Sequence, residues 1–152
     1  MTTGPSSSIV VRNAARFDAD AMSALEKAVF SDPWTSNMLE NALARPETIA
    51  LCGVSESELY GSIVLRTAAD EAEVMRIAVA AGHRRGGLGS LLLEKGLALA
   101  KNRGAVTAFL EVRETNRAAV SFYEAHSFEL TGKRPRYYSD TGEAALVMAR
   151  IL

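Results

Sequence analysis

Apolar residues recur every three or four positions in two early parts of the chain, which predicts helices there. Asp18 can cap the first helix, in which apolar side chains follow at helical spacing as far as Val29. Thr35 offers a second cap for a short helix that carries apolar residues as far as Leu43 and stops before Pro46. A pair of helices is therefore expected near the start of the chain.

The rest of the chain alternates strand-like segments with two further helices. One helix runs from about Leu88 to Arg103 and is followed by Gly104, at a position that favours a left-handed backbone; another spans Asn116 to Ala125. Runs rich in β-branched and aromatic residues predict strands at Ile9 to Arg12, Thr48 to Val54, Leu59 to Thr67, Ala72 to Val79, Val106 to Val112, Phe128 to Lys133 and Ala145 to Ile151. This order favours an α/β fold with one mixed sheet and helices on both faces.

The composition is that of one packed domain. Of 152 residues 48% are hydrophobic and 23% charged, so we expect a tail at residues 1–8 and a single domain at residues 9–152. A net charge of -1 argues against general binding to nucleic acid. The sequence has no pattern of an export signal or membrane span, and the single Cys52 fits the reducing cytoplasm. A monomer and a homodimer both stay open.

A glycine-rich turn lies between the strand that ends at Val79 and the helix that begins near Leu88. Residues 84–89 read RRGGLG, and the free backbone N–H groups of a helix start favour an anion such as a pyrophosphate there. The alternative is a tight turn with surface arginines. A dinucleotide fingerprint would need glycine at Leu92, and a P-loop would need lysine at Leu88, so both motifs fail.

The turn resembles the acyl-CoA signature of the GNAT acetyltransferases, with Arg84, Gly87 and Gly89 at the matching positions. Residues 110–116, LEVRETN, and residues 122–124, FYE, are similar to a second block of that superfamily in order and spacing. The resemblance implies the GNAT fold, a central mixed sheet with helices on both faces, and an acetyltransferase that uses acetyl-CoA as co-substrate and no metal.

From about Ile9 to Ile151 the chain resembles the RimI branch of that superfamily, the ribosomal-protein N-terminal alanine acetyltransferases. Three more elements carry this likeness, Pro33-Trp34-Thr35, Glu71 through Val79 and Arg134 through Tyr138. Gly86 stands where the family usually has glutamine, and Ser127 where it has glycine, so the local turn geometry departs from the family pattern. No ionisable group is lost by these changes.

The resemblance also assigns residues to the cofactor. Those implied to bind acetyl-CoA are Ile77, Ala78 and Val79 through their main chain, then Arg84, Arg85, Gly86, Gly87, Leu88, Gly89, Ser90, Asn116 and Tyr123. Asn116 is also a good cap for the helix that follows it, and one side chain could serve both roles.

Two side chains are implied to carry the chemistry. Glu111 is the candidate base, acting through water, and Tyr123 the candidate acid that protonates the departing sulfur. The apolar residues around Glu111 make a charge there unusual for a plain strand end, whereas Tyr123 can also be a core aromatic. Glu73, on the strand before the glycine turn, is the reserve candidate for the base.

Reference pKa values favour an N-terminal acceptor. Roughly 10 to 20% of an α-amine is neutral at pH 7, against well under ~0.1% of a lysine, so the α-amine asks less of a base. The resemblance implies that Glu111, Trp34, Tyr137 and Tyr138 line the substrate site, although Trp34 alone is typical of a core anchor. A basic cluster could meet an acidic substrate or be a solvated hairpin; its members are Lys133, Arg134 and Arg136.

These features predict transfer of an acetyl group to the N-terminal α-amine of a protein such as a ribosomal protein. The alternatives are a small-molecule amine or lysine acetyltransferase, a CoA-binding module without catalysis, and a structural interaction domain. The two histidines, His83 and His126, and Cys52 show no metal-ligand spacing, and we interpret them as structural or incidental.

Overall fold

The computed structural model describes residues 8–84 and 86–152. Apart from Ser8, the predicted tail lies outside the described residues. The elements in chain order are β1 (Val10–Asn13), a 3-10 turn (Arg16–Asp18), α1 (Ala19–Val29), α2 (Ser36–Leu43), β2 (Thr48–Ser55), β3 (Glu58–Ala68), β4 (Glu71–Val79), a 3-10 turn (Ala81–His83), α3 (Leu88–Asn102), β5 (Thr107–Arg113), α4 (Arg117–Ala125), β6 (Glu129–Arg134) and β7 (Ala145–Ile151). Each predicted helix and strand is present, with bounds that differ by at most one residue at either end.

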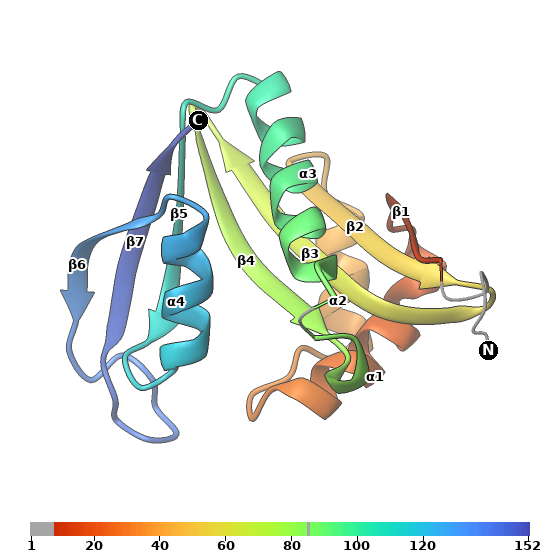
Figure 1. Cartoon of the computed structure of the whole chain (residues 1–152), viewed down its shortest axis with the longest axis horizontal. Coiled ribbons are helices and arrows are strands. Elements are labelled where there is room, and N and C mark those ends of the chain that lie inside the picture. The colour runs from red at the N-terminus through yellow and green to blue at the C-terminus, as the bar shows by residue number, and fades with distance from the viewer. Residues whose placement is uncertain (1–7, 85) are drawn as a thin grey trace.

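The strands form one mixed sheet of seven strands in the order β1-β2-β3-β4-β5-β7-β6 (Figure 1). Strands β1 to β4 pair antiparallel, β4 and β5 pair parallel, and β7 pairs antiparallel with both β5 and β6. The prediction of a mixed sheet is confirmed. The parallel pair at its centre is where the two antiparallel halves meet.

Strands β4 and β5 separate after a short parallel contact. They pair only over Glu71–Glu73 and Thr107–Phe109, and Figure 1 shows them diverging toward their carboxyl ends. The register between β3 and β4 shifts at this point, because Leu65 pairs with Val74 while Val64 pairs with Arg76. A bulge of this kind bends a strand. It therefore helps to open the sheet between β4 and β5.

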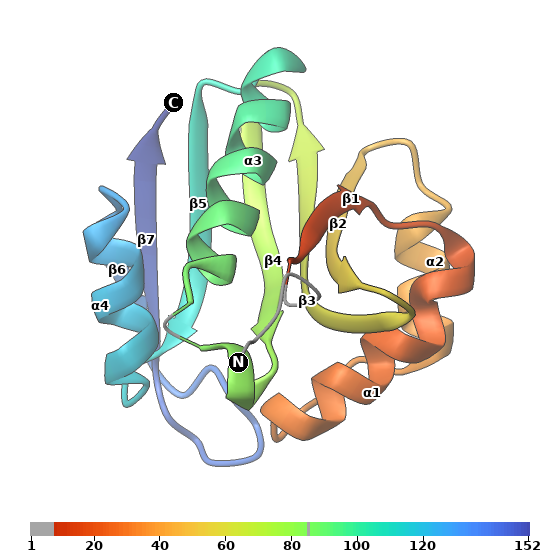
Figure 2. The same cartoon turned by 45° about the vertical axis from the view of Figure 1, so that its right-hand side comes forward.

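Helices cover both faces of the sheet, as predicted. Ile63 and Leu65 on β3 belong to the larger core cluster, into which α3 packs, whereas Val64 between them belongs to a smaller cluster under α1 and α2. This alternation follows from the two-residue period of a strand. Figure 2 shows α3 along one face, with α1 and α2 at the far side of the strands that it crosses. Cys52 lies in the smaller cluster, and burial raises the pKa of its thiol to about 12.

Two predicted caps are confirmed and one is wrong. The Thr35 hydroxyl accepts the N–H of Met38 at 3.2 Å, and Asn116 Oδ1 accepts the N–H of Ala119 at 3.1 Å. The side chain of Asp18 does not cap α1. Its carboxylate instead accepts two hydrogen bonds from Arg12 at 2.9 Å. The side chain that local sequence assigned to the start of α1 is therefore bound to β1.

A buried ion pair joins α1 to β4. The carboxylate of Glu26, 2% exposed, accepts hydrogen bonds from the Arg76 guanidinium and from the backbone N–H of Trp34. Replacing Glu26 with glutamine would leave Arg76 without its counter-charge, so we expect the free energy of unfolding at pH 7 to fall by about 2–3 kcal/mol in urea denaturation. The matched control is Glu40→Gln.

Glu40 faces Arg16 at 3.8 Å in a solvent-exposed pair. Exposed pairs of this kind stabilise a protein little, so the control should lose no more than about 0.5 kcal/mol. Equal losses in the two variants would show that the charge of Glu26 does not hold α1 to the sheet.

Candidate active site

A cavity of about 480 Å³ lies where β4 and β5 have separated. Its wall comes from the end of α1 and the loop after it, the second half of β4, the end of β5 and the first turns of α4. The lining residues are Val29, Phe30, Asp32, Met75, Arg76, Ile77, Ala78, Val79, Arg84, Glu111, Val112, Arg113, Asn116, Ala118, Ala119, Tyr123 and Tyr138. Of the predicted site residues, the cavity brings together Ile77, Ala78, Val79, Arg84, Glu111, Asn116, Tyr123 and Tyr138.

The main chain of Ile77, Ala78 and Val79 borders the opening. On one side these residues pair with Ile63, Ser62 and Gly61 of β3, while the pairing of β4 with β5 has ended at Glu73. The cavity occupies the other side. An extended chain of amides can add to such an edge as a further strand would. The predicted backbone contacts with the pantetheine arm of CoA fit this geometry.

The glycine turn lies at the start of α3. Gly87 has φ of 87°, in the left-handed region that favours glycine, and it offers no side chain to cap the helix. Leu88, Gly89 and Ser90 form the first turn of α3. Their backbone N–H groups have no hydrogen-bond acceptor within the helix. Such a start favours an anion, and a pyrophosphate fits it. Predicted cofactor residue Arg85 lies outside the described residues.

Glu111 stands near the end of β5 with a half-buried carboxylate. Its Oε1 accepts the Tyr137 hydroxyl at 2.8 Å, and its Oε2 lies 2.6 Å from Nε of Arg134. The hydrogen bond to Glu111 raises the pKa of Tyr137, so this hydroxyl remains a donor. Arg134, at the end of β6, and Tyr137, in the loop between β6 and β7, thus hold the Glu111 carboxylate at the cavity.

The reserve base is placed differently. Glu73 accepts a hydrogen bond from Arg66 at 2.8 Å and pairs with Phe109 across the parallel contact, before the strands separate. It is not among the residues that line the cavity. The geometry therefore favours Glu111 over Glu73 as the residue nearer an acceptor.

Tyr123 lies inside α4 and faces the core. It is 7% exposed, and its ring packs edge-on against Phe122 and Phe128 at centroid distances of 5.2 and 5.6 Å. Burial raises the pKa of its hydroxyl above the ordinary value. The side chain therefore keeps its proton at neutral pH, as a proton donor must.

Trp34 takes a different position from Tyr138. Its ring packs on the smaller core cluster, with the Arg76 guanidinium 5.4 Å from the ring centroid, and it is not among the cavity-lining residues. Tyr137 contacts the site through Glu111. A role for Trp34 in substrate binding stays a prediction, and its position favours support of the loop after α1.

The sequence did not single out Arg113, which joins three segments at the cavity. Its guanidinium lies 3.0 Å from Asp140 Oδ2, 3.3 Å from Glu143 Oε1 and 3.5 Å from Asp32 Oδ2. It also stacks on the Tyr138 ring, 4.0 Å from the centroid. The loop after α1 and the loop before β7 are both held by this one side chain. Arg113 belongs to the LEVRETN block at residues 110–116, but the resemblance assigned it no role.

The described part of the chain contains no group of three or more histidine, cysteine, aspartate or glutamate side chains placed to hold a metal ion. None of its helices combines the length and apolar character needed to cross a membrane.

Residues 19–128 match the family model described as Acetyltransferase (GNAT) family. The chain belongs to this GNAT family. The predicted fold, acetyltransferase activity and use of acetyl-CoA as co-substrate are thereby confirmed. The separated strands, the open edge of β4 and the glycine turn are the parts of this GNAT chain that fit the co-substrate.

Several relatives of this GNAT chain carry related names. It is 36% identical over 141 residues to the N-alpha-acetyltransferase RimI of Mycobacterium tuberculosis, covering 89% of this chain and 87% of the relative. It is 31% identical over 135 residues to the [ribosomal protein bS18]-alanine N-acetyltransferase of Salmonella typhimurium, covering 87% and 90%. The crystal structure of the ribosomal-protein-S18-alanine N-acetyltransferase from Escherichia coli superposes with a TM-score of 0.87 at 27% identity, over 95% of this chain and 94% of that one.

Proposed function

We propose that this acetyltransferase acts on the N-terminal α-amine of a protein, with a ribosomal protein as the expected acceptor. The observation that carries the proposal is the Glu111 carboxylate, held at the cavity by Tyr137 and Arg134 next to the open edge of β4. One relative named as an N-alpha-acetyltransferase and one named as a ribosomal-protein alanine N-acetyltransferase cover most of the chain and support the same acceptor class.

The acceptor must lose a proton before its nitrogen can attack. An α-amine has a reference pKa near 7.8 and a lysine near 10.4, so at neutral pH a single carboxylate acting through water suffices for the first and is poorly matched to the second. Glu111 and Asp32 are the carboxylates that line the cavity among the described residues, and Asp32 pairs with Arg113 at 3.5 Å. We assign the base to Glu111, and one carboxylate base fits an α-amine.

Acetyl-CoA supplies an acetyl thioester whose carbonyl carbon accepts the amine nitrogen. In our proposal Glu111 takes the proton that the amine releases as the carbon–nitrogen bond forms. Tyr123 gives its proton to the sulfur as the carbon–sulfur bond breaks, because its buried hydroxyl is protonated at neutral pH. The first turn of α3, with Arg84, holds the pyrophosphate, and the edge of β4 aligns the pantetheine arm.

Arg113 is expected to set the shape of the acceptor site. Replacing it with glutamine removes the charge that joins Asp32 to Asp140, so both loops lose a common anchor. We expect the KM for an acceptor peptide to rise about tenfold, while the KM for acetyl-CoA changes less than about twofold. Steady-state release of free thiol measures both constants.

Arg45→Gln is the matched control for that variant. Arg45 lies 3.9 Å from Glu47 in an exposed pair, away from the cavity, and its loss should leave both constants unchanged. A larger effect of Arg113→Gln on acetyl-CoA than on the peptide would contradict a role at the acceptor loops.

A peptide panel tests the acceptor class. Peptides with a free N-terminus should release thiol from acetyl-CoA at least about tenfold faster than N-blocked peptides that carry an internal lysine, given the fractions of neutral amine. Free small amines form the third arm. A preference for lysine or for a small amine would overturn the proposed acceptor and leave the family assignment intact.

A further inference from the structure

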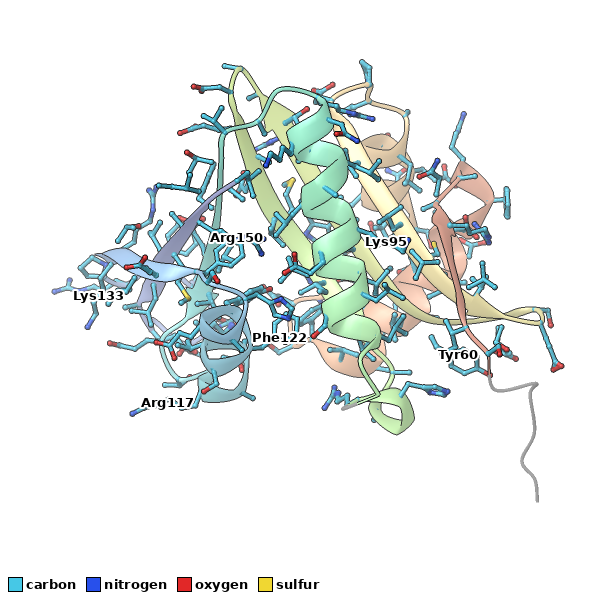
Figure 3. The ribbon with its side chains drawn as sticks, turned by 45° about the horizontal axis from the view of Figure 1, so that its top comes forward. Tyr60, Lys95, Arg117, Phe122, Lys133 and Arg150 are labelled. Carbon is cyan, nitrogen blue, oxygen red and sulfur yellow. The ribbon has the colours of Figure 1, made fainter. Side chains whose placement is uncertain are left out.

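A chain of hydrogen bonds runs from the first turn of α3 to β7. Ser90 Oγ lies 2.8 Å from Nε2 of His126, and Nδ1 of the same ring lies 2.6 Å from Oε2 of Glu94. Arg150 donates to the same Oε2 at 2.8 Å, to Oε1 at 3.2 Å and to the backbone carbonyl of His126 at 3.1 Å. Figure 3 shows Arg150 and Phe122 directed into the space between α3 and α4. The side chain of His126 is thus tied to the glycine turn through Ser90.

The chemistry of these groups fixes most of the proton positions. A carboxylate can only accept, so Nδ1 of His126 donates to Glu94. Nε2 then faces Ser90 with either a lone pair or a proton. When Nε2 carries no proton, the Ser90 hydroxyl donates to it and turns its own oxygen lone pairs elsewhere. When Nε2 is protonated it donates to Ser90, and the hydroxyl proton becomes free to point at an anion.

We propose that His126 is a positioning residue for acetyl-CoA: in its protonated form it turns the Ser90 hydroxyl into a donor for the cofactor pyrophosphate. The inference rests on the proposed cofactor site at the start of α3, to which Ser90 belongs. It adds a residue outside the glycine turn and links cofactor affinity to the protonation of one imidazole.

The charges around the ring support this linkage. Glu94 on α3 and Arg150 on β7 are the charged groups in contact with His126, and Phe122 of its own helix packs on the ring at 4.8 Å. Arg150, and after it His126, hold the pKa of Glu94 below its usual range, so the carboxylate is ionised wherever imidazole titrates. An ionised Glu94 at Nδ1 can balance the charge of the imidazolium, while Arg150 limits how strongly it does so.

The proposal predicts that CoA affinity depends on pH. Because the protein binds CoA better when His126 is protonated and Ser90 can donate, the affinity is highest at acid pH and falls as the pH rises through the imidazole range. One hydrogen bond to a charged acceptor corresponds to an increase of about tenfold in the Kd for CoA between pH 5.5 and pH 8.5. A tenfold change corresponds to a shift of about one pKa unit on binding, so binding at intermediate pH must also take up as much as about half a proton.

Calorimetric titration of CoA into the protein, in two buffers of different ionisation enthalpy, measures this uptake. CoA carries a phosphate monoester that titrates near pH 6, so only differences between variants count. His126→Gln removes the titratable ring, so this variant should bind CoA without the excess proton uptake. Ser90→Ala removes the hydroxyl that carries the linkage and should lose the excess uptake as well.

His83→Gln is the control, because His83 is the other histidine of the chain and its ring stacks on Tyr60 at 4.1 Å, whereas the ring bonded to Ser90 is that of His126. It should retain the native uptake. Full uptake in Ser90→Ala would overturn the proposal by showing a direct effect of the imidazolium charge. CoA binding without excess uptake in the native protein would also overturn it and leave the proposed cofactor site intact, whereas no CoA binding in the native protein would overturn both.

Discussion

Replacing Glu111 with glutamine is expected to lower the turnover number about 10²- to 10³-fold at neutral pH. The amide keeps the shape of the carboxylate and can still accept from Tyr137, but it cannot take the proton of the acceptor amine. The remaining activity should depend on amine that is already neutral, so it should rise about tenfold per pH unit below the amine pKa. Thiol release at saturating acetyl-CoA and peptide measures this turnover.

Glu73→Gln is the companion variant, since Glu73 is bound to Arg66 and lies outside the cavity lining. It should retain turnover within about threefold if Glu111 is the base. Unchanged turnover and an unchanged pH profile in Glu111→Gln would show that another group removes the proton. A large loss in Glu73→Gln alone would move the assignment to that residue.

The second large effect is expected for Tyr123→Phe, with turnover about 10²-fold lower. The variant loses only the hydroxyl, and its ring can keep both aromatic contacts, with Phe122 and Phe128. Calorimetry should therefore give a Kd for CoA within about twofold of the native value. The acyl-transfer rate, measured in a single turnover, should fall by the same factor as the turnover number.

Tyr60→Phe is the matched control for this substitution, because Tyr60 contacts His83 and does not line the cavity. Its turnover should be unchanged. If Tyr123→Phe lost CoA affinity and turnover to the same extent, Tyr123 would be a packing residue and the acid would lie elsewhere.

Local patterns predicted most of the fold because they act within a few residues. Thr35 and Asn116 lie next to the N–H groups that they cap, and Gly104 has the left-handed φ of 100° that its position indicated. Asp18 shows where such reasoning ends. Arg12 lies six residues away on the preceding strand, and its guanidinium competes successfully for the same carboxylate.

The candidate site was predicted in part for the same reason. Residues in a recognisable motif, such as Glu111 and Tyr123, could be named from the sequence and do line the cavity. The cluster around Arg113 could not, because its partners Asp32 and Asp140 are far apart along the chain and meet only after the sheet has formed. The bulge that opens β4 away from β5 likewise depends on pairing between strands.

The measurement that tests the proposed function most directly uses one peptide with a free N-terminal alanine and one internal lysine. The peptide is incubated with the protein and acetyl-CoA, and fragment-ion mass spectrometry locates the added acetyl group. We expect acetylation of the α-amine with the lysine unmodified, and loss of that product in Glu111→Gln at equal time. Acetylation of the lysine with a free α-amine would overturn the proposed acceptor.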